Sequence, residues 1–185
     1  MDAYIQWVSQ HPILSACAQF AVLGPLGEII AASLAAKRPA LPCPPFKLLG
    51  KAVAWAILGA VIKYGFAGMK GFTNALLDAK MLPSFFSIGI GHAFAVSVFT
   101  NVLFGPQMML FHRLEDNIVL GERGFAGMGK AIKTLVWFWI PAHTATFSLP
   151  APFQIGLAAL WGVALGVILG LSKSNAKEKL SKRQE

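Results

Sequence analysis

The longest uncharged stretch of this chain constrains its fold most strongly. Residues Thr134–Ser172 contain no Asp, Glu, Lys or Arg, whereas one membrane-spanning helix needs only about 20 apolar residues. The stretch is interrupted at Ser148–Pro152, where two prolines remove backbone donors and restrict the residues before them. It therefore predicts two spans, at about Thr134–Phe147 and Phe153–Leu171, joined by a tight turn.

The composition indicates an integral membrane protein. Of the 185 residues, 56% are hydrophobic and 13% are charged, half of the roughly 25% charged residues of soluble domains. Earlier apolar stretches predict three more spans, at about Ile13–Ala36, Ala52–Leu77 and Ser84–Leu110. We therefore expect an all-α polytopic membrane helix bundle. Residues 1–172 would form a single transmembrane helical domain, followed by a basic, frayed tail at 173–185.

Lysine and arginine are distributed unevenly among the predicted loops. The proline-rich segment Lys37–Lys51, predicted to be extended and non-helical, and the polar loop His112–Lys133 hold four each, and the tail holds five. Five spans place these three segments on one side, with 13 cations against 1 on the other. Four spans, with Thr134–Phe147 re-entering without crossing, give 6 against 8. The positive-inside rule favours five spans and a tail on the cytosolic or matrix-like side.

Ionisable and polar residues inside the predicted spans are the candidates for a functional site. Lys63 and Lys70 lie seven residues apart, close to two helical turns, and Asn74 follows on nearly the same face. A cation at the centre of a membrane helix costs about 2.5–3.5 kcal/mol. One interpretation is a water-filled path that favours anions, lined by Glu28, Lys63, Lys70, Asn74 and His143. The other is structural: Lys63 pairs with Glu28, Lys70 reaches the membrane interface, and His143 is hydrogen-bonded inside the bundle. The two interpretations are compatible.

Small residues recur at every fourth position of the last predicted span, at Ala158, Gly162, Gly166 and Gly170. This spacing places them on one helix face, which allows another helix to approach closely in lipid. The pattern predicts helix packing against either a neighbouring span or a second copy of the chain.

No motif indicates catalysis, a cofactor or a metal site. Cys17 and Cys43 form no metal-binding or disulfide pattern. His112, Glu115 and Asp116 lie close together in sequence, but beside a predicted span they are interpreted as a solvated helix end. The net charge of +8 lies mainly in loops and the tail, where it indicates membrane topology rather than nucleic-acid binding. We expect a protein that is not an enzyme.

Three stretches carry a resemblance to a known family. Residues 4–34 (YIQWVSQHPILSACAQFAVLGPLGEIIAASL) give an aromatic-rich lead, a proline and then Gly27-Glu28. Residues 68–78 (GMKGFTNALLD) end in Leu-Asp. A third set, in the uncharged stretch Thr134–Ser172, consists of Trp139, Pro141, Thr146-Phe147, Pro150 and Gln154.

Together these stretches resemble the family of small peroxisomal and inner mitochondrial membrane proteins named for Mpv-seventeen and the 22-kDa peroxisomal membrane protein. Glu28, Thr146 and Gln154 stand where that family has Asp, Asn and Arg. The resemblance implies a channel-like role for metabolites in a mitochondrial inner or peroxisomal membrane. A bacterial inner membrane would present the same charge asymmetry.

The expected function is therefore passage of small solutes through a pore in a lipid bilayer, with a preference for anions. The alternative is a structural or scaffolding membrane protein. It would assemble, as a homo-oligomer or with another protein, through the glycine-rich C-terminal helix.

Overall fold

The computed structural model describes residues 2–125 and 127–181, with side chains described as far as Ile168. These residues form helices and connecting turns without a β-strand. The α-helices are α1 (Asp2–Gln10), α2 (Pro12–Ala36), α3 (Pro45–Asp78), α4 (Gly89–Phe99), α5 (Gly105–Leu120), α6 (Met128–Thr134), α7 (Ile140–Phe147) and α8 (Ala151–Ser181). The 3-10 turn η1 (Ser84–Phe86) precedes α4, and π-helical segments η2 (Thr100–Phe104) and η3 (Leu135–Trp139) join α4 to α5 and α6 to α7.

Four helices in the described chain are long and apolar enough to cross a membrane: Pro12–Ala36, Pro45–Asp78, Gly89–Leu120 and Ala151–Ile168. Large apolar side chains are exposed along them, including Val22, Leu49, Ile57, Val102 and Leu160. In a water-soluble bundle such side chains would be buried, whereas lipid accommodates them. The protein is an all-α polytopic membrane bundle, as the sequence predicts.

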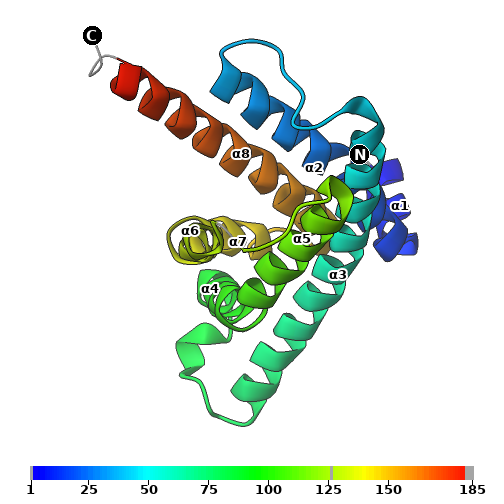
Figure 1. Cartoon of the computed structure of the whole chain (residues 1–185). Helices are drawn as coiled ribbons and strands as arrows, with labels where there is room; N and C mark the ends of the chain where they lie inside the picture. Colours follow the sequence, from blue (N-terminus) through cyan, green and yellow to red (C-terminus); the bar gives the residue numbers. More distant parts are fainter. Residues whose placement is uncertain (1, 126, 182–185) are drawn as a thin grey trace.

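The centre of the bundle is formed by α2, α3 and α8. Helices α2 and α8 lie side by side (Figure 1) and run in the same direction, because Gln19 is next to Gly156 and Gly27 is next to Val163. Helix α3 runs antiparallel to α2, with its Gly59 against Ala16. Buried residues from these helices form the core cluster: Ala16, Phe20, Phe66, Ile155, Ala158 and Ala159.

The parallel arrangement of α2 and α8 supports five crossings. The end of α5 lies beside the start of α3, where Lys47 Nζ donates a 2.6 Å hydrogen bond to the Leu120 carbonyl. Helix α8 begins at the opposite end, beside α1 and the start of α2. The chain therefore returns between them through the continuous helical segment α6–η3–α7, which is about 30 Å long at 1.5 Å per residue. This segment contains the predicted span Thr134–Phe147, although it is not among the four long apolar helices.

The long helical run Gly89–Leu120 bends where α4 passes into α5. In Figure 1, α4 is seen nearly end-on, while α5 lies along α3. The π-helical turn η2 and Pro106 interrupt the regular backbone hydrogen bonds at this point, and both are known causes of sharp bends. Gly105 is buried at the bend, and a Cβ there would lie 2.8 Å from Leu135 Cδ2. Residues at the bend, including Thr100, Phe104 and Gly105, line the cavity described below.

Two of the predicted loops are wrong in part. Segment Lys37–Lys51 is helical from Pro45 onward, because proline is compatible with the first turn of a helix. Segment His112–Lys133 contains the end of α5, to Leu120, and the start of α6, from Met128. The predicted break at Ser148–Pro152 is confirmed, since α7 ends at Phe147 and α8 begins at Ala151.

The C-terminal tail also differs from the prediction. Helix α8 continues to Ser181, so the basic tail is helical as far as that residue. Residues 182–185 lie outside the described chain.

Candidate functional site: a bundle cavity beside a buried ion-pair network

A cavity of about 340 Å³ lies inside the bundle, within the size range of pockets for small organic ligands. Apolar and aromatic side chains form most of its wall, and among the described lining residues only Glu28 carries a carboxylate, ammonium or guanidinium group. The described lining residues are Phe20, Glu28, Trp55, Leu58, Ile62, Phe66, Thr100, Asn101, Phe104, Gly105, Met108, Met109, His112, Leu135, Trp139, His143, Ala158, Gly162, Leu165 and Gly166.

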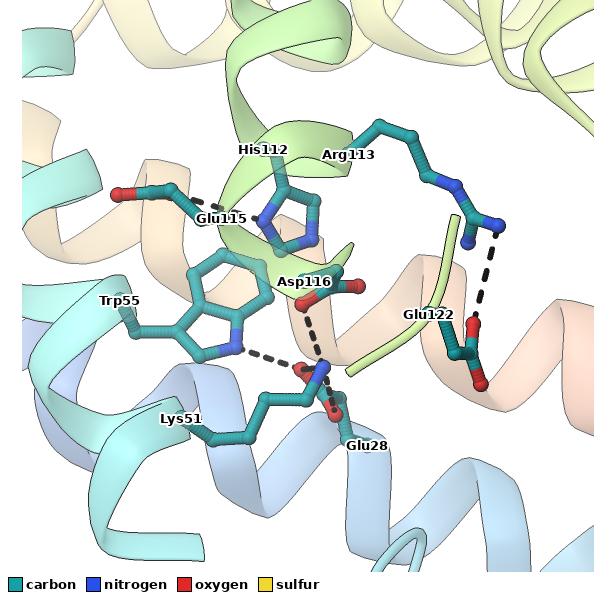
Figure 2. A network of polar contacts seen from close by, with 8 residues as sticks. All are labelled: Glu28, Lys51, Trp55, His112, Arg113, Glu115, Asp116 and Glu122. Atoms are coloured by element: carbon teal, nitrogen blue, oxygen red, sulfur yellow. Dashed lines mark hydrogen bonds and ion pairs between the residues drawn. The ribbon is translucent and has the colours of Figure 1, made fainter. Parts of the chain in front are cut away.

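Glu28 belongs to a network of charged groups that joins three helices (Figure 2). Lys51 of α3 reaches between two acids and is only 3% exposed. Its Nζ lies 2.9 Å from Glu28 Oε2 on α2 and 2.6 Å from Asp116 Oδ1 on α5. A lysine is rarely buried unless it is paired, and here two carboxylates replace the water that its ammonium loses.

Trp55 fixes the position of Glu28 at the cavity wall. Its Nε1 donates a 2.7 Å hydrogen bond to Glu28 Oε1. The indole lies against Gly24, where any Cβ would overlap the ring, and it stacks on Phe20 at 6.3 Å between centroids. The other aromatic neighbour is His112 of α5, at 4.5 Å. Glycine at position 24 is therefore what allows the indole to lie between α2 and α5.

The network brings together three groups that can ligate metals, although no metal site is predicted from the sequence at these positions. Ligand atoms of Glu28, His112 and Asp116 lie within 4.8 Å of one another. The interpretation of His112 and Asp116 as a solvated helix end is wrong, because α5 turns them towards α3. However, Lys51 Nζ already occupies the position between the two carboxylates, so the structure supplies its own cation there.

Acidic groups outnumber basic groups in this region. Both carboxylate oxygens of Glu115 are buried without a hydrogen-bond partner in the described chain, and His112 Nδ1 lies 4.0 Å from Glu115 Oε2. Arg113 points elsewhere, towards Glu122 at 3.8 Å and the carbonyl of Gly124. Lys51 is therefore the only ammonium that offsets the acids next to the cavity, among the residues described.

A second cluster of polar side chains on the cavity wall consists of Asn101 from η2, Trp139 from η3 and His143 from α7. Asn101 Nδ2 lies 3.1 Å from His143 Nδ1 and donates to the Ser97 carbonyl at 2.8 Å. The ring of Trp139 lies 5.1 Å from that of His143. Trp139 Nε1 is buried and has no acceptor within the described residues. Trp139 therefore contributes its ring, and not an accessible donor, to the cavity wall.

The five predicted pore-lining residues separate into two groups. Glu28 and His143 line the cavity, whereas Lys63, Lys70 and Asn74 do not. Asn74 Oδ1 lies 2.8 Å from His92 Nε2. Lys70 donates to Gln154 and lies 5.5 Å from the centroid of Phe147. The predicted pairing of Lys63 with Glu28 is wrong, because Lys51 takes that place.

The predicted packing stripe faces partly towards α2 and partly towards the cavity. A Cβ on Gly166 would lie 2.9 Å from the Gly27 carbonyl oxygen, so this close approach is made within the chain. Ala158 is buried in the core, and an added Cβ on Gly162 would meet nothing within 4 Å. Gly170 belongs to α8, in the part whose side-chain surroundings are not described.

No protein-family model, curated protein or solved structure matches the chain. The resemblance to the Mpv-seventeen family therefore stays a prediction from the motifs, and so does the organellar or bacterial membrane that would host the protein.

Proposed function

We propose that this membrane protein binds small, mainly apolar organic solutes in its bundle cavity, as a pore or carrier that passes them across the bilayer. The observation that carries the proposal is the cavity itself, because membrane bundles otherwise fill their interior with packed side chains. Its wall combines an apolar surface with a few polar groups at separate places, which is the usual composition of a site for a small organic ligand.

The lining argues for organic solutes rather than inorganic anions. Lys63 and Lys70, on which an anion preference would depend, do not belong to the wall. The only charged residue among the described lining residues is an acid, Glu28, and aromatic side chains line the same cavity. The scaffolding alternative has less support, because Gly166 of the small-residue stripe already packs against α2 of the same chain.

A cavity-filling substitution tests the proposal. Gly162→Leu introduces a side chain into the cavity without a clash at its Cβ, since no atom lies within 4 Å of that position. Gly68→Leu is the matched control, because Gly68 is also a helical glycine with nothing within 4 Å of a Cβ but lies outside the cavity.

The probe is para-bromoneopentylbenzene, whose bromine quenches the fluorescence of Trp55 and Trp139 on the cavity wall. We expect saturable quenching in the detergent-solubilised wild-type protein and in Gly68→Leu, and its loss in Gly162→Leu. Equal quenching in all three proteins would show that the probe partitions only into detergent and would contradict the proposal.

A further inference from the structure

The charge around the cavity defines a narrower class of ligand. We propose that the cavity selects monovalent organic cations, with an ammonium group held near Glu28 and an apolar body among the aromatic side chains. This inference rests on the proposed function, because it assumes that the cavity binds a solute.

The first argument is the charge balance of the network. Glu28 and Asp116 share a single ammonium, that of Lys51. A negative charge with little access to water is costly unless a cation accompanies it. Lys51 offsets one carboxylate, so a ligand cation that enters the cavity meets an excess of negative charge.

The second argument is that Glu28 retains capacity to interact with a ligand. Its Oε1 accepts hydrogen bonds from Trp55 and Lys51, whereas Oε2 has Lys51 as its only partner among the described residues. A carboxylate has about four acceptor positions. The carboxylate is thus held in place from one side by Lys51 and Trp55, while it forms part of the cavity wall.

The third argument is the aromatic wall. Trp55, Phe66, Phe104 and Trp139 line the same cavity as Glu28. The faces of such rings attract ammonium groups, and aromatic cages of this kind recognise quaternary ammonium ligands. An anion would meet the ring faces and a carboxylate, both of which repel it. An inorganic cation would lose its water to a wall that is mostly apolar.

A divalent metal is the main competing ligand, since Glu28, His112 and Asp116 lie within reach of one another. It would have to displace Lys51 from between the two carboxylates. An organic cation needs no such displacement, because the apolar part of the cavity accommodates its body.

The test compares two probes that differ only in charge. Para-bromobenzyltrimethylammonium carries a permanent positive charge, and para-bromoneopentylbenzene has carbon in place of its nitrogen. Binding is measured by saturable quenching of tryptophan fluorescence in the full-length protein. In Glu28→Gln we expect the cation to bind roughly tenfold more weakly, with the neutral probe unchanged. Each probe's affinity is expressed as the ratio of wild type to Glu28→Gln, which cancels any partition of the probe into detergent.

Two further variants keep the test decisive. Asp116→Asn removes the same excess charge while leaving the Glu28–Lys51 pair intact, so it should also weaken cation binding if Glu28→Gln fails to fold. Glu122→Gln is the matched control, because Glu122 is an exposed acid paired with Arg113 and lies outside the cavity. It should leave both probes unaffected.

The outcomes separate this inference from the proposed function. Saturable binding of the neutral probe, with the same cation affinity in wild type, Glu28→Gln and Asp116→Asn, would overturn cation selection and leave solute binding in place. Two other results would also overturn cation selection. One is that the anionic para-bromobenzoate binds as tightly as the cationic probe. The other is that Zn²⁺, added without any other ligand, displaces the cationic probe. Absence of saturable binding by either probe in the folded wild type would overturn both proposals.

Discussion

The lysines of α3 lie in two contrasting environments, one near the start of the helix and one further along it. Lys51, near the start of the helix, is almost fully buried between two carboxylates from α2 and α5. Lys63 and Lys70, further along, have no acidic partner in the described structure; Lys70 meets a neutral amide and an aromatic ring. The comparison shows that position within a hydrophobic run does not decide which cation is buried. The acids on neighbouring helices decide it.

The antiparallel register of α2 and α3 explains the difference. Glu28 is opposite Lys51, and Ala16 is opposite Gly59. One helical turn beyond Gly59, Lys63 is level with the first turn of α2, and Lys70 lies beside the start of α8. Neither the start of α2 nor the start of α8 carries an acidic residue, so neither lysine meets a carboxylate there.

The largest effect is expected from Lys51→Met. It leaves Glu28 and Asp116 buried without their cation, and removal of one partner from a buried ion pair typically costs about 3–5 kcal/mol. Unfolding in mixed detergent and SDS micelles measures the change. The double variant Lys51→Met with Glu28→Gln should recover part of the loss, because one unpaired charge is then removed. Equal stability of wild type and Lys51→Met would contradict the network's role.

Gly24→Ala should have the next largest effect, at about 1–3 kcal/mol. The added methyl group would overlap the Trp55 indole and push it away from Glu28. The matched control is Gly68→Ala, where a methyl group meets no neighbour within 4 Å. The same unfolding assay should show destabilisation for the first variant only; similar values for both would mean that the contact of Trp55 with Gly24 is not important.

Lys70→Met should destabilise the protein by about 1 kcal/mol. It removes a hydrogen bond to Gln154 and a cation–π contact with Phe147, each of which is worth on the order of 1 kcal/mol, while the methionine recovers part of the apolar packing. Gln154→Leu alone removes the same hydrogen bond and serves as a comparison. If Lys70→Met lowered the free energy of unfolding as much as Lys51→Met does, Lys70 would contribute as much to stability as the buried Lys51, which would contradict the comparison.

Lys63→Met should change stability least, by less than about 0.5 kcal/mol. The described structure gives Lys63 no hydrogen bond and no ion pair to lose, and the methionine matches the apolar part of its side chain. Because Lys63 lies outside the cavity lining, the substitution should also leave saturable probe quenching unchanged. Altered probe affinity in this variant would place the solute path along α3 instead of in the cavity.

Some of the candidate site can be predicted from the sequence, and the rest depends on pairing between helices. Glu28 and His143 are recognisable as polar groups inside apolar stretches, and both line the cavity. Lys51 and Asp116 are not, because each lies at the edge of an apolar stretch and resembles an ordinary loop charge. The spacing of His112 and Asp116, one helical turn apart, is a signal that the segment is helical with one polar face.

The sequence by itself determines that this protein is a helical membrane bundle and where its chain breaks. Uncharged stretches of sufficient length must form helices in lipid, since their backbone groups find no water there, and the prolines at 150 and 152 separate α7 from α8. Only the tertiary structure decides that Lys51, rather than Lys63, pairs with Glu28, and that the bend after α4 leaves a cavity. Both depend on the register and angle at which helices distant in sequence pack, and local hydrophobicity carries no information about either.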